Sequence, residues 1–294
     1  MPSIEGRVTR PDGTTLLTRH WALDTADAGG AWAGPPWASV LLVHGLGEHS
    51  GRYEHVGEQL ARSGLDVSAY DHRGMGGSGG PRGDIDQWAT LHDDLADRLH
   101  EVRPRASGRP VVLYGHSLGG LMVAGYLLTD RPAPDLAVLS APALGSAVPG
   151  WKQSLVRGTS GVLPGLRISN PIDGSMLSRD PTVGERTVGD PRCVSSSTLR
   201  FGAAAFREQA RVGPLAPGGF GLPTLVLHGD DDRLVPVSAS AVLQGAPGVE
   251  RRTFPGLRHE LHNEPESAEI LDGVIGWLRL EVASASSSPT PVAV

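Results

Sequence analysis

The stretch VVLYGHSLG, residues 111–119, joins an apolar run to a Gly-x-Ser-x-Gly motif. Leu121 and Met122 follow at helical spacing, so the pattern predicts a buried strand, a sharp turn with Ser117 at its tip, and a helix. The motif glycines belong where a Cβ atom would collide with the neighbouring strand or helix. The helix would direct backbone N–H groups and the positive end of its dipole toward a developing oxyanion. Ser117 is therefore the candidate nucleophile.

A second stretch, residues 76–80, also fits Gly-x-Ser-x-Gly but stands in a different context. No apolar strand runs directly into Ser78, and Pro81 follows where a helix would have to begin, so a loop is predicted here. Residues 74–79 also match Gly-x-Gly-x-x-Gly, but the delayed helix separates these glycines from the helix N-terminus that a dinucleotide phosphate needs. We therefore expect Ser117 rather than Ser78 as the nucleophile, and no cofactor.

The bulk composition argues against several classes of protein. The chain of 294 residues is 39% hydrophobic and 20% charged, with a net charge of −6 and no block of like charge. This charge balance argues against a nucleic-acid partner and against a polybasic membrane surface. Cys193 is the only cysteine, so we expect no internal disulfide and no metal site. Neither a signal peptide nor a membrane-spanning apolar run is recognisable, so a cytoplasmic protein is expected.

Apolar runs separated by turn signals predict strands that alternate with helices along most of the chain. Such alternation is typical of an α/β fold with a mostly parallel central sheet and helices on both faces. The predicted strands are 4–9, 16–21, 39–43, 65–70, 111–114, 136–139, 224–227 and 251–254, and the predicted helices are 53–63, 84–103, 237–244 and 265–280 together with the one after Ser117.

The alternation is interrupted once, and this divides the chain into four segments. Residues 144–221 are rich in Gly, Pro, Arg and Ser and have weak helical periodicity, so we expect a lid inserted over the sheet. Residues 1–143 and 222–282 then form the two parts of the core, with a loop at 24–37. The last residues, 283–294, are small and polar and include proline, so we expect a flexible tail.

A serine nucleophile needs a base to take its proton and an acid to orient that base, in the chain order serine, acid, histidine. Asp230, Asp231 and Asp232 follow the first predicted strand after the lid. Spacing favours Asp232, with Asp231 second. His259 and His262 follow the last predicted strand, and His259 is favoured because it lies closer to the strand end. The two histidines are three residues apart, so they do not form a His-Glu-x-x-His zinc motif.

The oxyanion hole of such a site needs two backbone N–H donors. One is the residue after the nucleophile, Leu118. The other is expected from the loop after the strand at 39–43, where Leu46 lies between two glycines that permit the turn. The chain thus contains a candidate for each part of a serine-hydrolase site: nucleophile, base, acid and two amide donors.

With these residues assembled, the chain resembles the α/β-hydrolase fold and, within it, the monoacylglycerol lipase and lysophospholipase-like family. The resemblance implies that the acid, which stands directly before Arg-Leu in that family, is Asp232, and that the histidine is His259. It also implies that the oxyanion amides are those of Leu46 and Leu118. The resemblance spans about residues 39–280 and rests on the stretches 44–53, 71–74, 78–79, 115–120, 140–142, 227–234 and 259–264.

The resemblance further implies how a substrate is held. The family's polar pocket for the glycerol end of the substrate corresponds to Glu48, Arg52 and His262. The family's lid has an apolar outer surface that meets lipid interfaces, although packing against the sheet is an alternative interpretation of the same residues. That surface would be formed here by Val148, Trp151, Leu155, Val162 and Leu166.

These features predict a cofactor-free serine esterase that cleaves monoacylglycerols to fatty acid and glycerol through an acyl-enzyme. The enzymatic alternative is another single-chain acyl substrate, as in a carboxylesterase, lysophospholipase or thioesterase. A non-catalytic ligand-binding module is the alternative from another class. We expect a small lipid ester as the substrate, no nucleic-acid partner, and transient contact of the lid with lipid surfaces. The sequence does not predict the oligomeric state.

Overall fold

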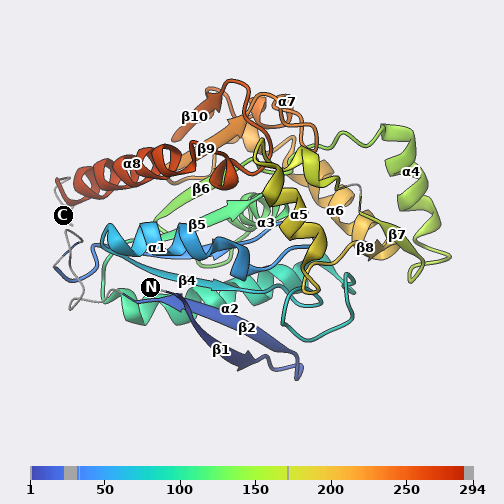
Figure 1. Ribbon diagram of the computed structural model, residues 1–294, viewed down its shortest axis with the longest axis horizontal. Helices are drawn as coiled ribbons and strands as arrows, with labels where there is room; N and C mark the ends of the chain where they lie inside the picture. The colour runs from blue at the N-terminus through green and yellow to red at the C-terminus, as the bar shows by residue number, and fades with distance from the viewer. Residues whose placement is uncertain (1, 23–31, 33, 171, 288–294) are drawn as a thin grey trace, which may run out of the picture.

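The computed structural model describes residues 2–22, 32, 34–170 and 172–287. An eight-stranded sheet forms the centre of the molecule, with the strand order β1-β2-β4-β3-β5-β6-β9-β10 (Figure 1). The strands from β4 to β10 in this order run parallel, whereas β1 pairs antiparallel with β2 and β2 with β4. This confirms the predicted α/β fold. The strands are Ile4–Thr9 (β1), Thr15–Trp21 (β2), Ala38–Val43 (β3), Leu65–Tyr70 (β4), Val111–His116 (β5), Leu136–Ser140 (β6), Thr224–Gly229 (β9) and Val249–Phe254 (β10).

The centre of the sheet is apolar because helices cover both of its faces. Every residue of β3, β5, β6 and β9 is buried, which explains why continuous apolar runs predicted these strands. The edge strands β1 and β10 carry charged residues, such as Arg7 and Glu250, which discourage pairing with another sheet. The carboxyl ends of the parallel strands meet at one edge of the sheet, so the loops that follow them lie close together.

Two apolar cores lie between the sheet and its helices, one on each face. Leu60 and Val274 belong to the core beneath α1 and α8, and Leu95 and Leu121 belong to the core beneath α2 and α3. The helices of these layers are Glu54–Arg62 (α1), preceded by the 3-10 turn Ser50–Tyr53 (η1), Trp88–Ala106 (α2), Leu118–Leu127 (α3), Leu199–Val212 (α6), Ser238–Ala241 (α7) and Ser267–Ser287 (α8).

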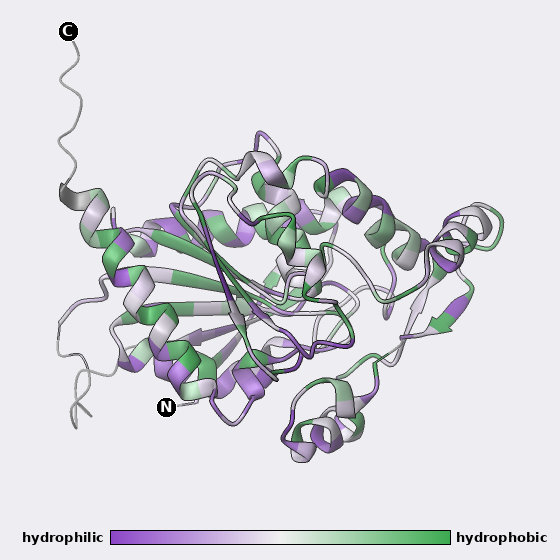
Figure 2. Ribbon diagram, turned by 90° about the horizontal axis from the view of Figure 1, so that it is seen from above, coloured by the Kyte–Doolittle hydropathy of each residue, from purple (hydrophilic) through white to green (hydrophobic). Residues whose placement is uncertain are grey.

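The predicted lid, residues 144–221, has two parts that differ in packing. Its last helix, α6, packs against α2 and α3 and buries Phe201 in the core. Its first helix, α4, has no buried residue and projects from the body together with the short sheet β7–β8 (Figures 1 and 2). The remaining elements of the segment are Gly150–Thr159 (α4), Arg167–Ser169 (β7), Gly174–Met176 (η2), Pro181–Gly189 (α5), Ser196–Thr198 (β8) and Ala216–Gly218 (η3).

The helix predicted at 84–103 begins later, at Trp88. The reason is Asp84, whose carboxylate accepts hydrogen bonds from the Thr198 hydroxyl (2.6 Å) and from Arg200. Asp84 therefore lies in a loop whose hydrogen bonds connect the core to the start of α6.

The predicted tail, residues 283–294, is wrong in its first part. Helix α8 continues to Ser287, so residues 283–287 are helical. Alanine alternates with serine there, which a helix tolerates, and Pro289 follows in the sequence. The rest of the predicted tail, and most of the loop predicted at 24–37, lie outside the described residues. Among the helices that are described, none combines the length and the hydropathy needed to cross a bilayer.

Candidate active site

Ser117 lies between β5 and α3 in the strained backbone conformation of a nucleophile elbow. Its φ is +53°, in a region that residues other than glycine rarely occupy. The Ser117 amide donates to the Ser140 carbonyl at the end of β6 (2.9 Å), which helps to hold the turn. Both motif glycines are needed. An added Cβ would lie 2.5 Å from the Gly119 oxygen if placed on Gly115, and 2.1 Å from the Val43 oxygen if placed on Gly119.

Three side chains from three strand ends form one hydrogen-bonded chain. His259, in the loop after β10, has its Nε2 atom 2.8 Å from Oγ of Ser117. Its Nδ1 atom lies 2.7 Å from Oδ2 of Asp232, which follows β9. The other carboxylate oxygen, Oδ1, accepts the backbone amides of Leu234 and Val235 at 2.9 Å each. The structure therefore brings together the three side chains that the sequence suggested.

The competing candidates lie elsewhere. Asp231 pairs with Arg233 at the surface, and Asp230 accepts the backbone amide of a neighbouring turn. Ser78 is buried, and its hydroxyl donates to the carbonyl of Asp71 at 2.6 Å. The geometry thus separates candidates that spacing along the chain left open.

The electrostatic environment of the chain suits proton transfer. Burial alone would raise the pKa of the Asp232 carboxyl, but the charge on His259 and hydrogen bonds from His228 and His259 hold it well below its usual range. Burial alone would lower the pKa of the His259 imidazole, but the Asp232 carboxylate raises it above its ordinary value. Ionised Asp232 accepts the Nδ1 proton of His259, which leaves Nε2 to accept the hydroxyl proton of Ser117.

The two segments that carry the predicted amide donors, the start of α3 and the loop after β3, meet at the elbow. Leu118 begins α3, so its amide is one of the N–H groups that a helix N-terminus leaves without an intrahelical partner. The loop after β3 packs directly against the elbow, since an added Cβ on Gly45 would lie 3.2 Å from the Cβ of Ser117. The Gly45 amide already donates to Oε1 of Glu48 (2.6 Å), so it is occupied. The next amide along this loop, that of Leu46, remains the candidate donor to an oxyanion.

The three residues predicted for the glycerol pocket lie together, but they are not equally free. Arg52 binds Oε2 of Glu48 (2.6 Å) and forms a two-bond ion pair with Glu260 at 2.7 and 2.8 Å. The Tyr53 hydroxyl donates to Oε1 of Glu48 at 2.7 Å. His262 stacks on Tyr53 with ring centroids 4.7 Å apart, and neither of its ring nitrogens has a partner among the described residues. Burial holds the pKa of His262 well below its ordinary value, so the ring is neutral.

Two buried residues that contact predicted site residues were not predicted from the sequence. Glu260 anchors Arg52, and His228 has its Nε2 atom 3.2 Å from Oδ2 of Asp232. A signal existed for Glu260, because it directly follows His259 and its carboxylate can pair with Arg52, an arginine predicted for the glycerol pocket. A signal also existed for His228, which lies at the carboxyl end of a parallel strand, where functional groups gather.

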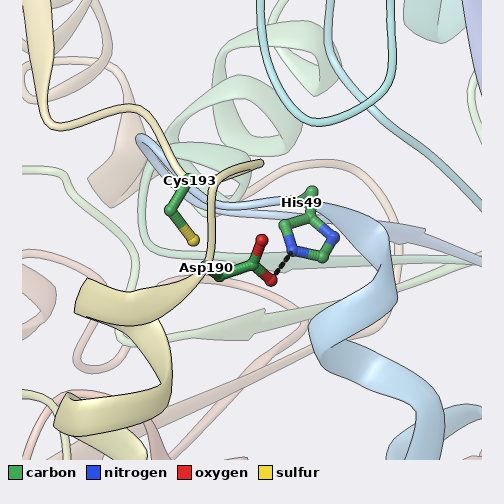
Figure 3. Close-up of side chains that lie close together, drawn as sticks. All are labelled: His49, Asp190 and Cys193. Carbon is green, nitrogen blue, oxygen red and sulfur yellow. Dashed lines mark hydrogen bonds and ion pairs between the residues drawn. The ribbon is translucent and has the colours of Figure 1, made fainter.

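The inserted segment is bound to the loop that carries Leu46. Nε2 of His49 lies 2.8 Å from Oδ2 of Asp190 (Figure 3), and the Val194 amide donates to the Gly47 carbonyl at 2.7 Å. These two contacts join the stretch after α5 to the oxyanion loop. A cavity of about 600 Å³ lies beside this junction, and its wall includes His49, Arg52, Asp190 and His262.

His49, Asp190 and Cys193 offer ligand-type atoms within 4.8 Å of one another, close enough to surround a metal ion. The protons in this cluster favour hydrogen bonding instead. Nδ1 of His49 accepts the Gly51 amide, so its Nε2 carries the proton that Asp190 accepts. Burial raises the pKa of the Cys193 thiol to about 11, so the sulfur is protonated at neutral pH. A metal ion would have to displace both protons.

The sheet, the elbow and the hydrogen-bonded chain define an α/β hydrolase of the serine type. The chain belongs to the Hydrolase_4 family, described as serine aminopeptidase S33, whose sequence profile matches residues 34–266.

Individual relatives narrow the resemblance. The chain is 34% identical over 273 residues to the monoacylglycerol lipase of Mycolicibacterium smegmatis, which covers 90% of this chain and 93% of that protein. It is 30% identical over 290 residues to the monoglyceride lipase of Homo sapiens, which covers 95% of this chain and 92% of that protein. The crystal structure of Paleococcus ferrophilus monoacylglycerol lipase superimposes with a TM-score of 0.75 at 32% identity, over 85% of this chain and 96% of that one. These relatives confirm the predicted resemblance to monoacylglycerol lipases.

Proposed function

We propose that this protein is a serine hydrolase that cleaves the ester bond of monoacylglycerols and releases fatty acid and glycerol. The observation that carries the proposal is the continuous hydrogen-bonded chain from Oγ of Ser117 through His259 to Asp232. Similarity across 90% of this chain to an enzyme named monoacylglycerol lipase supports the substrate class.

The first half-reaction transfers the acyl group to the enzyme. Oγ of Ser117 attacks the ester carbonyl while Nε2 of His259 takes the hydroxyl proton, and Asp232 stabilises the imidazolium that forms. The amides of Leu46 and Leu118 donate to the oxyanion of the tetrahedral intermediate. His259 then passes its proton to the departing glycerol oxygen, and the acyl group remains on Ser117 as an ester.

The second half-reaction repeats these roles with water. Nε2 of His259 takes a proton from a water molecule whose oxygen attacks the acyl carbonyl of the acyl-enzyme. The same two amides stabilise the second oxyanion. The intermediate collapses, Oγ of Ser117 takes the proton back from His259, and the fatty acid is released.

The polar end of the substrate is assigned to the pocket beside His262. A buried polar group without a partner is costly, and both ring nitrogens of His262 are in that state. A neutral imidazole has one donor and one acceptor, which match the hydroxyl groups of glycerol. Glu48 and Arg52 shape the pocket, because their own hydrogen-bonding groups are largely used on each other, on Glu260 and on Tyr53.

The projecting part of the insertion is assigned to lipid contact. Trp151 and Leu155 of α4 are 67% and 57% exposed, and Val162 and Leu166 in the next loop are 81% and 52% exposed. This exposure argues against the alternative interpretation, in which these side chains pack against the sheet. Val148, the fifth residue predicted for this surface, is half-buried. Exposed tryptophan and aliphatic side chains suit the boundary between lipid headgroups and acyl chains.

A hydrolysis panel tests the proposal. Purified protein is assayed against monoacylglycerols from C4 to C18, the matching di- and triacylglycerols, lysophospholipids and acyl thioesters. The highest kcat/KM is expected on a monoacylglycerol. A preference for triacylglycerol would contradict the substrate class, and a preference for a lysophospholipid or a thioester would favour the alternative acyl substrates over monoacylglycerol.

A further inference from the structure

His228 is a buried residue that touches the hydrogen-bonded chain, yet it has no role in the mechanism above. It lies at the carboxyl end of β9, and the side chains of His228 and Asp232 are both fully buried. Its Nε2 atom lies 2.9 Å from the Val235 carbonyl oxygen and 3.2 Å from Oδ2 of Asp232. Because a carbonyl oxygen can only accept, Nε2 carries a proton and shares it between these two acceptors.

The opposite side of the ring is also held by hydrogen bonds. Oγ of Ser240, in α7, lies 2.9 Å from Nδ1 of His228. Arg251, in β10, donates from Nε to Oγ of Ser240 at 3.0 Å, and from Nη2 to the Val237 carbonyl at 3.0 Å. The Ser240 hydroxyl lies within hydrogen-bond distance of two acceptors, the Val237 carbonyl at 3.1 Å and Nδ1 of the neutral His228 ring at 2.9 Å. Arg251, Ser240 and His228 are thus linked by consecutive hydrogen bonds.

One carboxylate oxygen therefore serves two imidazoles. Oδ2 of Asp232 accepts Nδ1 of His259 at 2.7 Å and Nε2 of His228 at 3.2 Å. Oδ1 accepts two backbone amides at 2.9 Å each. The backbone amides locate one oxygen, and His228 is the side chain that restrains the other one where it faces His259.

We propose that His228 is a positioning residue for ester hydrolysis, which holds Oδ2 of Asp232 in line with Nδ1 of His259 and withdraws part of its negative charge. This inference rests on the proposed function, because it requires His259 to act as the base. Without the His228 donor, the carboxylate is free to tilt. Its charge is also directed more fully at His259, which increases the proton affinity of that imidazole. Tilting lowers the rate by misaligning the pair, and the higher proton affinity lowers the fraction of neutral His259 at neutral pH, with little change in substrate binding in either case.

Two substitutions at this position separate the donor from the shape of the ring. In His228→Gln, the amide nitrogen lies as many bonds from Cβ as Nε2 does, so a donor to Asp232 is kept. His228→Leu fills a similar volume without a donor. We expect His228→Leu to lower kcat by about 10- to 100-fold with little change in KM. We also expect it to move the acid limb of the kcat/KM profile to higher pH, whereas His228→Gln stays close to the parent protein in both respects.

Further variants keep the test decisive. Ser240→Ala leaves the ring in place but removes the hydrogen-bond partner of Nδ1, so a smaller change in the same direction is expected even if His228→Leu does not fold. Thr224→Val is the control, because it removes a buried hydroxyl from the far end of the same strand. It is expected to change neither kcat nor the acid limb. Glu48, Glu260 and His116 also face His259 and are the same in all variants.

The outcomes distinguish this inference from the proposed function. If folded His228→Leu and Ser240→Ala keep the parent kcat and pH profile while Ser117→Ala is inactive, His228 has no positioning role and the proposed function stands. Loss of activity in His228→Gln equal to that in His228→Leu also overturns the role. If Ser117→Ala keeps full activity, the proposed function and the role of His228 both fail.

Discussion

At the scale of single residues, hydrolysis is expected to depend on the Ser117 hydroxyl, which is hydrogen-bonded to His259. Replacing Ser117 by alanine removes the attacking oxygen and leaves the oxyanion donors and the binding pocket in place. We expect kcat on a p-nitrophenyl ester to fall by about 10⁴-fold or more, with loss of labelling by a fluorophosphonate probe. Ser78→Ala is the matched control, because Ser78 lies in the alternative motif, and its labelling is expected to persist. Parent-level hydrolysis by Ser117→Ala would contradict the assignment.

The pH dependence follows from His259. Only the neutral imidazole accepts a proton from Ser117, and the Asp232 carboxylate raises the pKa of His259 above its ordinary value. Activity is therefore lost as pH falls through this raised pKa, so the acid limb of kcat/KM should lie above about pH 6.5, the usual histidine value. Asp232, whose pKa is held well below its usual range, stays ionised throughout and adds no second limb. A profile from pH 4 to 9 checks this, and a flat profile down to pH 5 would contradict it.

Single residues were predictable where a motif names them and less so where only a fold decides. The elbow motif points to Ser117 alone, because its strand and helix are visible in the sequence. Asp230, Asp231 and Asp232 look alike along the chain, and what distinguishes Asp232 is burial and the two backbone amides on its Oδ1. His228 lies in the stretch 227–234 that carries the resemblance, but that stretch predicted no role for it, since the proposed role depends on contacts with α7 and β10 that form only on folding.

At the scale of elements, helix α3 meets strand β3 so closely that no side chain fits between them. An added Cβ on Gly119 would lie 2.1 Å from a backbone oxygen of Val43, and neither partner can move aside cheaply. We expect Gly119→Ala to lower the free energy of unfolding by about 3 kcal/mol and to abolish hydrolysis.

Gly158→Ala provides the control for that substitution. Gly158 also lies in a helix, α4, but an added Cβ there would meet nothing within 4 Å. This variant should be neutral or more stable by about 0.5–1 kcal/mol, because alanine favours a helix. Urea denaturation of both variants measures the difference, and equal stabilities would argue against the close approach of α3 and β3.

Helix α4 provides the second prediction at this scale. Trp151→Ser and Leu155→Ser remove exposed apolar area without touching the core. We expect slower hydrolysis of monoacylglycerol in vesicles, with unchanged hydrolysis of a short soluble ester. Leu280→Ser, at a side chain of α8 that is 69% exposed, is the control and should affect neither. Equal loss on both substrates would point to a folding defect rather than lipid contact.

Elements were predictable in proportion to their burial. Each central strand shows a continuous apolar run because both of its faces are covered, so those strands were found within a few residues. The start of α2 was missed because Asp84 forms contacts with Thr198 and Arg200, which are more than a hundred positions away in the chain. The insertion gave the weakest signal because α4 buries no residue.

At the scale of the whole molecule, the insertion carries Cys193, whose thiol lies near His49 and Asp190 where the insertion meets the loop that carries Leu46 (Figure 3). Burial raises the pKa of this thiol to about 11. At pH 8 the native thiol should therefore react with iodoacetamide about 100-fold more slowly than in urea, where an ordinary cysteine pKa applies. Cys193→Ser should take up no label in either condition. Equal rates for native and unfolded protein would show that the Cys193 thiol is not buried in the folded protein.

The contacts of the stretch 190–194 constrain how a substrate can enter. Asp190 binds His49 and Val194 binds Gly47, so this stretch shares hydrogen bonds with the loop that carries Leu46. Lifting it away to admit an acyl chain would break these bonds and disturb the loop that carries Leu46, the predicted oxyanion donor. Helix α4 buries no residue and packs against α6. We therefore expect the acyl chain to enter beside α4, where displacement of that helix would leave the hydrogen bonds to the loop that carries Leu46 intact.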